Sequence, residues 1–187
     1  MVDDYNLNTR TAVPEHLRVL SDRYPRAQWE AHRNLDGLTR FWLDRHLMFR
    51  KAHSALVDQT EAFLDGNLDP GRFRQDTQRL AGYFINGLHA HHHIEDTQFF
   101  PQLSAKDARL GEAFDLLDRD HDALEEWLAR LTTAVNGLVG PAPVAIDAAG
   151  SVHKDLVGFG GVLDRHLCDE EEIVVPVILE HGGPEMT

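Results

Sequence analysis

The chain has 187 residues, of which 42% are hydrophobic and 26% charged, a composition typical of one soluble globular domain with an apolar core. Its formal net charge of −13 argues against nucleic-acid binding, which needs clustered Lys and Arg. The single cysteine, Cys168, excludes an internal disulfide and a cysteine-rich metal site. No apolar run approaches the roughly 20 residues of a membrane helix, and Met1–Arg10 lacks a signal-peptide pattern. We therefore expect no membrane association and a cytoplasmic location.

Residues 1–37 form an N-terminal extension of less regular pattern than the rest of the chain. Pro14 and Pro25 interrupt it, and we expect two short helices, Glu15–Arg23 and Arg26–Leu35. The extension covers one side of the remaining domain or serves a partner; the pattern itself does not choose between the two.

Four long segments follow, and in each of them apolar residues recur three and four positions apart, which is the period of a helix with one buried face. The segments are 38–64, 72–103, 108–135 and 146–180. Breaker-rich stretches end the first, third and fourth of them: 65–71, 137–143 and 182–184. Strand-type alternation is nearly absent. We predict an all-α, up-down-up-down four-helix bundle over residues 38–181, followed by a short tail, 182–187.

A weak internal repeat connects the second and fourth segments. His91 is followed four residues later by Glu95, and His166 is followed four residues later by Glu170. In both copies a second acidic residue directly follows that glutamate, and a proline stands six residues after it. We expect these prolines, Pro101 and Pro176, to end or kink their helices. The first and third segments share His-x-Ala-Leu, which begins at His53 and at His121.

The spacing of the repeat has a chemical consequence. Residues four apart lie one turn up the same helix face, so each copy presents an imidazole and a carboxylate to one neighbour. A four-helix bundle brings these two pairs together with one histidine from each of the other two helices. Buried imidazoles and carboxylates are costly without partners, and a metal removes that cost. Such mixed ligands suit iron, manganese or zinc, and two carboxylates suit a two-metal site.

Other chemistries lack their motifs. The sequence contains no Glu-x-x-His of ferritin-like proteins, no His-Glu-x-x-His of zinc proteases, no P-loop and no Gly-x-Ser-x-Gly. Gly158, Gly160 and Gly161 fall inside the fourth helical segment, where close helix packing or a kink explains them better than phosphate binding.

The motifs His91-x-x-x-Glu95, with Phe99-Phe100-Pro101 after it, and His166-x-x-x-Glu170 are similar to those of the hemerythrin-like, His-His-Glu cation-binding proteins. The resemblance covers about residues 38–181. It implies a four-helix bundle that holds a non-haem di-iron centre, whereas manganese or zinc stays possible from the ligand types alone. It also implies that His53 and His121 are the histidine ligands of helices one and three, and that Glu95 is one bridging carboxylate. The second bridge is Glu170, or Glu171 if the spacing of the oxygen carriers is kept.

The chain departs from the oxygen carriers on the third helix. Those proteins have two histidines four residues apart there, whereas Leu117 and Glu125 stand four positions before and after His121. Either His92, next to the helix-two ligand, or Glu125 is the candidate replacement. Asp96 is expected to orient a ligand. His46, seven residues before His53, is expected to be a core histidine bonded to a backbone group, with a channel-lining role as the alternative.

Three functions remain open for such a centre. The first is the binding of dioxygen or nitric oxide for sensing, storage or delivery. The second is a di-iron oxidoreductase that acts on nitric oxide or peroxide. The third is a non-catalytic module that senses iron or redox state, in which metal loss reshapes the bundle. Reversible binding, turnover and metal-linked stability distinguish the three.

Overall fold

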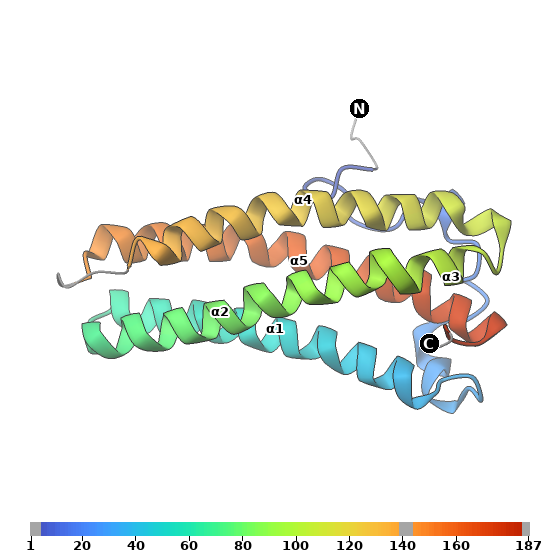
Figure 1. The fold of residues 1–187 in the computed structure, drawn as a ribbon, viewed down its shortest axis with the longest axis horizontal. Helices are drawn as coiled ribbons and strands as arrows, with labels where there is room; N and C mark the ends of the chain where they lie inside the picture. Colours follow the sequence, from blue (N-terminus) through green and yellow to red (C-terminus); the bar gives the residue numbers. More distant parts are fainter. Residues whose placement is uncertain (1–4, 139–143, 185–187) are drawn as a thin grey trace. The chain divides into compact units, whose positions relative to one another are not determined.

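The computed structural model describes residues 5–138 and 144–184, and within those ranges it contains helices and connecting segments but no strand. Its α-helices are α1 (Gly37–Leu64), α2 (Pro70–Ile94), α3 (Phe100–Ser104), α4 (Gly111–Asn136) and α5 (Ile146–His181) (Figure 1). The all-α fold class predicted from the sequence is therefore confirmed. Most of the predicted loop 137–143 lies outside the described residues. No described helix combines the length and the apolarity that a membrane crossing requires.

Glycine and proline residues form several ends of the long helices, as the helix-breaking stretches of the sequence predicted. Gly66, just after α1, and Gly182, just after α5, have φ of +75° and +84°. This left-handed conformation is readily available to glycine and ends a helix by turning the chain away. Pro70 opens α2, where its missing N–H costs nothing, and the Asp69 side chain accepts a hydrogen bond of 2.9 Å from the Arg72 backbone N–H.

The second predicted segment, 72–103, is not one regular helix. A π-helical turn, η3 (Glu95–Phe99), separates α2 from α3. Such turns insert an extra residue into the helical register and occur often at functional sites. In α5, by contrast, Pro176 neither ends the helix nor stops its continuation to His181. Of the two alternatives expected for Pro176, an end or a kink of its helix, the structure excludes the end.

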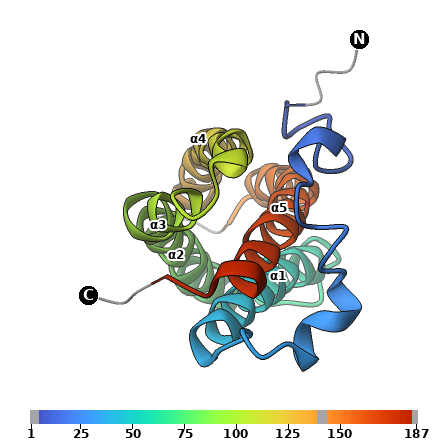
Figure 2. The ribbon, with the colours of Figure 1, turned by 90° about the vertical axis from the view of Figure 1, so that its right-hand side faces the viewer.

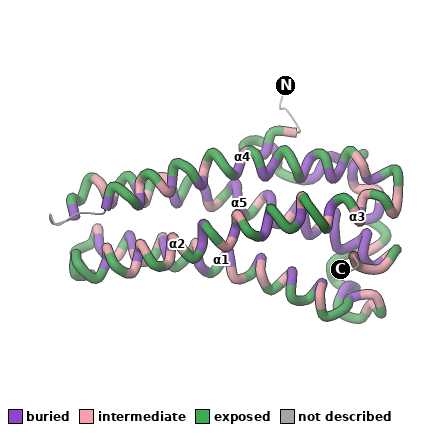
Figure 3. Tube along the Cα trace, in the orientation of Figure 1, coloured by how far each residue is buried: buried purple, intermediate pink, exposed green. Residues whose placement is uncertain are grey.

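The structure divides into two compact units. The first contains the described residues of 1–46, 91–123 and 164–187, and the second contains those of 47–90 and 124–163. Each unit includes a stretch of each of the four long helical segments. Buried and exposed positions alternate along α1, α2 and α4 with the helical period, whereas residues 166–179 of α5 include no exposed position (Figure 3).

The N-terminal segment, residues 5–36, is an integral part of the first unit. Its predicted helices shrink to two 3₁₀ turns, η1 (Glu15–Leu17) and η2 (Arg26–Ala31), each of which directly follows a proline. It nevertheless buries five apolar side chains in the core of that unit, which are Val13, Leu17, Leu20, Trp29 and Leu35. The segment, drawn in blue, runs beside α5 and then leads into α1 (Figure 2).

The second unit is closely packed around two glycines of α5. A Cβ built on Gly160 would lie 2.6 Å from Cε1 of His53, and one built on Gly158 would lie 2.8 Å from the Trp127 ring. The His53 ring thus fills the space that Gly160 leaves, with its Nε2 2.8 Å from the backbone oxygen of Leu156. Close helix packing, as predicted, explains these two glycines, whereas Gly161 meets no atom within 4 Å.

This packing predicts opposite effects for two neighbouring substitutions. Gly160→Ala gains helix propensity, but its methyl group displaces the His53 ring, so we expect a net loss of about 1–3 kcal/mol in the free energy of unfolding. Gly161→Ala has the same propensity gain without the clash and is expected to stabilise the chain by up to about 1 kcal/mol. Chemical denaturation of both variants checks the pair. A Gly160→Ala protein as stable as Gly161→Ala would contradict the packing.

Candidate metal centre

Two groups of buried side chains in the first unit gather atoms that bind metals. The first group consists of His46, His91, Glu95 and Glu170, and one ligand atom from each lies within 4.8 Å of the others. His91 Nε2 lies 3.0 Å from His46 Nε2 and 3.0 Å from Glu95 Oε1. His46 Nε2 lies 3.4 Å from Glu170 Oε2. These four side chains therefore converge on one point from α1, α2, the π turn and α5.

The second group consists of His92, His121 and His166, whose ligand atoms also lie within 4.8 Å of one another. The rings of His92 and His121 stack with centroids 4.0 Å apart, and those of His121 and His166 are 4.9 Å apart. Phe100 covers the outer face of this stack, with its ring centroid 5.5 Å from that of His121. The second group is thus a set of three imidazoles from α2, α4 and α5.

Two glutamates connect the groups. Glu95 Oε1 faces His91 of the first group at 3.0 Å, and its Oε2 faces His121 Nε2 of the second at 3.8 Å. Glu170 Oε2 lies 3.4 Å from His46 Nε2 and 3.4 Å from His166 Nε2. Each carboxylate therefore stands between two sets of imidazoles, which is the position of a ligand shared by two metals.

The local helical geometry explains how so few residues supply both groups. His91 and His92 are neighbours in α2, so their side chains point about 100° apart and enter different groups. The π turn begins at Glu95, one turn after His91, and carries both Glu95 and Asp96. In α5 the regular four-residue spacing aligns His166 with Glu170, as the sequence predicted.

Several buried atoms of the two groups have no hydrogen-bond partner among the described residues. They are Glu95 Oε2, His121 Nε2, His166 Nε2 and both carboxylate oxygens of Glu170. Orphaned buried polar atoms are rare and costly in folded proteins. The distance of 3.0 Å between His46 Nε2 and His91 Nε2 matches two nitrogens bound at right angles about 2.1 Å from one ion. The residues therefore fit metal ions, which would satisfy all of these atoms.

Burial also sets the charge of these groups in the chain alone. It raises the pKa of Glu95 to about 7 and raises that of Glu170 well above its usual value, where the nearby Glu95 charge adds to the effect. Burial lowers the pKa of His166 to about 4 and lowers that of His91 well below its usual range. The protein thus disfavours charged carboxylates and charged imidazoles here, and cations would supply the missing counter-charge.

Carboxylates outside the two groups hold the far nitrogens of three imidazoles. His121 Nδ1 lies 2.7 Å from Asp96 Oδ1, and His46 Nδ1 lies 3.1 Å from Glu171 Oε1. His166 Nδ1 lies 3.4 Å from Asp120 Oδ2. An N–H donated to a carboxylate leaves the Nε2 lone pair pointing inward, which is the usual arrangement behind metal-bound histidines.

The structure brings together most of the residues that the sequence singled out. His91, Glu95, His121, His166 and Glu170 all belong to the two groups, and His92 belongs to the second. Asp96 and Glu171 lie one step outside, on the far nitrogens of His121 and His46. Glu125, the other candidate replacement, instead lies 2.7 Å from His89 Nδ1 in the second unit, and both side chains are exposed.

His53 is the predicted ligand that the structure does not bring into either group. It belongs to the second unit, where its Nε2 lies 2.8 Å from the Leu156 backbone oxygen. The buried histidine of α1 in the first group is His46, two helical turns earlier on the same face. The two ring nitrogens of His46 face Glu171 Oε1 and His91 Nε2, which are side chains of the centre and not the backbone group that the sequence analysis expected as its partner. His46 therefore takes the place of His53 in the ligand set that we propose below.

A comparison with family models supports the cation-binding character of these residues. The model described as the hemerythrin HHE cation binding domain matches residues 37–178, a range that contains all the members of both groups. Searches among curated proteins and among solved structures gave no significant match.

Proposed function

The chain belongs to the hemerythrin HHE cation-binding family, and we propose that it holds two non-haem iron ions and binds dioxygen or nitric oxide for sensing, storage or delivery. One observation carries the proposal: two sets of buried imidazoles face opposite sides of the same two carboxylates, Glu95 and Glu170. Mixed imidazole and carboxylate ligands suit iron, with manganese and zinc as the nearest competitors.

In this proposal the two groups hold unequal numbers of protein ligands. His46 and His91 would hold the first metal and His92, His121 and His166 the second, and Glu95 and Glu170 would serve both. The first metal therefore has fewer protein donors, which favours its side for a small ligand. Bound iron supplies reversible one-electron chemistry and an exchangeable ligand position.

The chain's own residues fix and shield this centre. The Trp42 Nε1–H donates a hydrogen bond to Glu95 Oε1 and so holds that carboxylate in place. The Trp42 ring lies 4.1 Å from the His46 ring, centroid to centroid, and excludes water from that side. Together with Phe100, whose ring lies 5.5 Å from that of His121, it lines the centre with apolar aromatic surface, which suits a small uncharged ligand such as dioxygen or nitric oxide.

The test is metal analysis of the purified protein with optical spectra, taken after reduction without air and again after exposure to dioxygen or nitric oxide. We expect about two irons per chain, as a two-metal site requires, and a spectral change that reverses when the gas is removed. Catalysed loss of nitric oxide or peroxide would assign a di-iron oxidoreductase instead. A chain that holds no iron, or one loosely bound zinc, would contradict the di-iron centre.

The proposal also includes the cytoplasmic location expected from the sequence. Cellular thiol systems keep that compartment reducing.

A further inference from the structure

The N-terminal segment, residues 5–36, places one arginine behind each of the two metal-binding groups. We propose that this segment is a working part of the metal centre: Arg10 and Arg26 position the carboxylates that hold His166 and His46, and thereby set how firmly each metal is retained. The inference rests on the proposed function, since it concerns the retention of the two metals.

Arg10 supports the second group. It is only 5% exposed, and its Nε and one terminal nitrogen donate hydrogen bonds of 2.7 Å to Asp169 Oδ2 and Asp120 Oδ1, respectively. Its other terminal nitrogen contacts Asp120 Oδ2, the oxygen that lies 3.4 Å from His166 Nδ1. The guanidinium therefore fixes the carboxylate of Asp120 at both oxygens, and Asp120 in turn holds the His166 ring.

Arg26 supports the first group in the same way. One of its terminal nitrogens contacts Glu171 Oε2, while Glu171 Oε1 lies 3.1 Å from His46 Nδ1. The Arg26 guanidinium also lies over the Trp29 ring, 4.9 Å from its centroid. Each group thus has a chain of contacts that runs from an arginine through a carboxylate to the far nitrogen of an imidazole.

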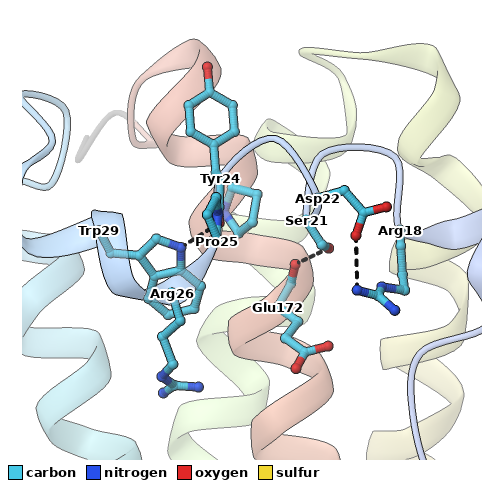
Figure 4. Close-up of a pocket in the computed structure, with 9 residues that line it drawn as sticks. Arg18, Ser21, Asp22, Tyr24, Pro25, Arg26, Trp29 and Glu172 are labelled. Carbon is cyan, nitrogen blue, oxygen red and sulfur yellow. Dashed lines mark hydrogen bonds and ion pairs between the residues drawn. The ribbon is translucent and has the colours of Figure 1, made fainter.

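Arg26, unlike Arg10, is open to solvent. Its side chain is 58% exposed and lines a pocket of about 330 Å³ between the N-terminal segment and α5 (Figure 4). Arg18 lines the same pocket, but it pairs at 2.9 Å with Asp22 of its own segment (Figure 4). The two arginines therefore share a location and differ in whether they reach a carboxylate of the metal centre.

The segment is anchored to α5 independently of its arginines. The Ser21 hydroxyl donates a hydrogen bond of 2.7 Å to the Glu172 backbone oxygen, and the Asn34 side-chain amide donates one of 2.7 Å to the Leu179 oxygen. Val13, Leu17 and Leu20 are buried in the core of the first unit. Replacing Arg26 alone should consequently leave the segment in place and remove only the contacts of the guanidinium with Glu171 and with the Trp29 ring.

The physical effect follows from the role of the carboxylates. Without the guanidinium, Glu171 is less firmly placed and the His46 ring is freer to turn away from its metal. Loss of the carboxylate behind a metal-bound histidine commonly lowers metal affinity by about 10–100-fold, and because Arg26 acts through that carboxylate, this range is the largest effect expected of its loss. His121 offers an internal comparison, because its Nδ1 faces Asp96 of the π turn and does not depend on the N-terminal segment.

The experiment follows the release of both metals from the loaded full-length protein to excess chelator, by absorbance and by metal analysis. In Arg26→Gln we expect one of the two metals to leave faster than in the wild type, by up to about 100-fold, while the other leaves at the wild-type rate. Arg10→Gln should accelerate the release of the other metal. Arg26→Lys, which keeps the charge, should restore most of the retention, and Arg18→Gln should behave as the wild type.

A purely structural role makes a different prediction. It would lower the melting temperature and accelerate the release of both metals equally, and that result would overturn the inference. Release of both metals at the wild-type rate from both variants would overturn it as well. Arg10→Gln takes one partner from each of two buried carboxylates, Asp120 and Asp169, and if this variant fails to fold, the release measured for the half-exposed Arg26 variant decides the test. A wild-type chain without a metal pair would overturn the proposed function itself, which metal analysis shows before any variant is made.

Discussion

His46→Ala is expected to lose one of the two metals, whereas His53→Ala is expected to keep both. His46 is fully buried, and its Nε2 lies 3.0 Å from His91 Nε2 and 3.4 Å from Glu170 Oε2. Removing it leaves His91 as the sole imidazole of the first group, too few for a firmly held ion beside the two shared carboxylates. Metal analysis should give about one ion per chain for His46→Ala and about two for His53→Ala.

The two variants control for each other, because each deletes a histidine ring from α1. His53→Ala removes a packed ring and its contact with the Leu156 oxygen, so a loss of about 1–3 kcal/mol in stability is expected without a change in metal content. Circular dichroism would show that both variants remain helical. Full metal content in His46→Ala, or metal loss in His53→Ala, would restore the ligand set inferred from the sequence.

The choice between these two histidines shows what helical periodicity leaves open. His46 and His53 are seven residues apart, so they occupy the same face of α1 and the periodic pattern cannot separate them. The lengths of the helices do separate them. His91 lies 21 residues after the start of α2, while His46 and His53 lie 18 and 11 residues before the end of α1. In an antiparallel hairpin only His46 stands near the level of His91, but this count needs the helix ends.

The parts of the centre that could be predicted are those determined within one helix. The four-residue spacing alone placed His91 with Glu95 and His166 with Glu170. The π turn at Glu95 was not predictable from hydrophobic periodicity, because the apolar pattern continues through it from Leu88 to Phe100 and Leu103. It adds a residue to the register just where Glu95 and Asp96 reach separate imidazoles.

The role of the N-terminal segment lay beyond the sequence for another reason. Arg10 meets Asp120 and Asp169, which are 110 and 159 positions away along the chain. Contacts over such separations have no periodic signature, and the short 3₁₀ turns give the segment little local pattern. A buried arginine can nevertheless be recognised once the fold is known, since arginine is almost never fully buried without a carboxylate partner.

The largest effect is expected at Glu170, which both groups share. Glu170→Gln keeps the size of the side chain but removes the negative charge that faces His46 on one side and His166 on the other. An amide is a weak ligand, so in the proposed centre each metal would lose a charged donor and the pair would lose one of its two shared carboxylates. We expect metal content to fall from about two ions per chain to well below one, with the gas-dependent spectrum lost as well.

In the metal-free protein, Glu170→Gln should not lower thermal stability, although the same substitution weakens the metal-loaded protein. Without metal, Glu170 is a fully buried carboxyl beside Glu95, so its replacement by a neutral amide removes an unfavourable buried group. Metal-free Glu170→Gln should therefore unfold at the same or a slightly higher temperature than the metal-free wild type, yet gain no stability from added iron, unlike the wild type. Glu172→Gln, two residues along α5 and outside both groups, is the matched control and should bind two metals. A Glu170→Gln chain that is markedly destabilised when metal-free would instead make this glutamate a structural residue, with the metal pair held by the imidazoles and Glu95 alone.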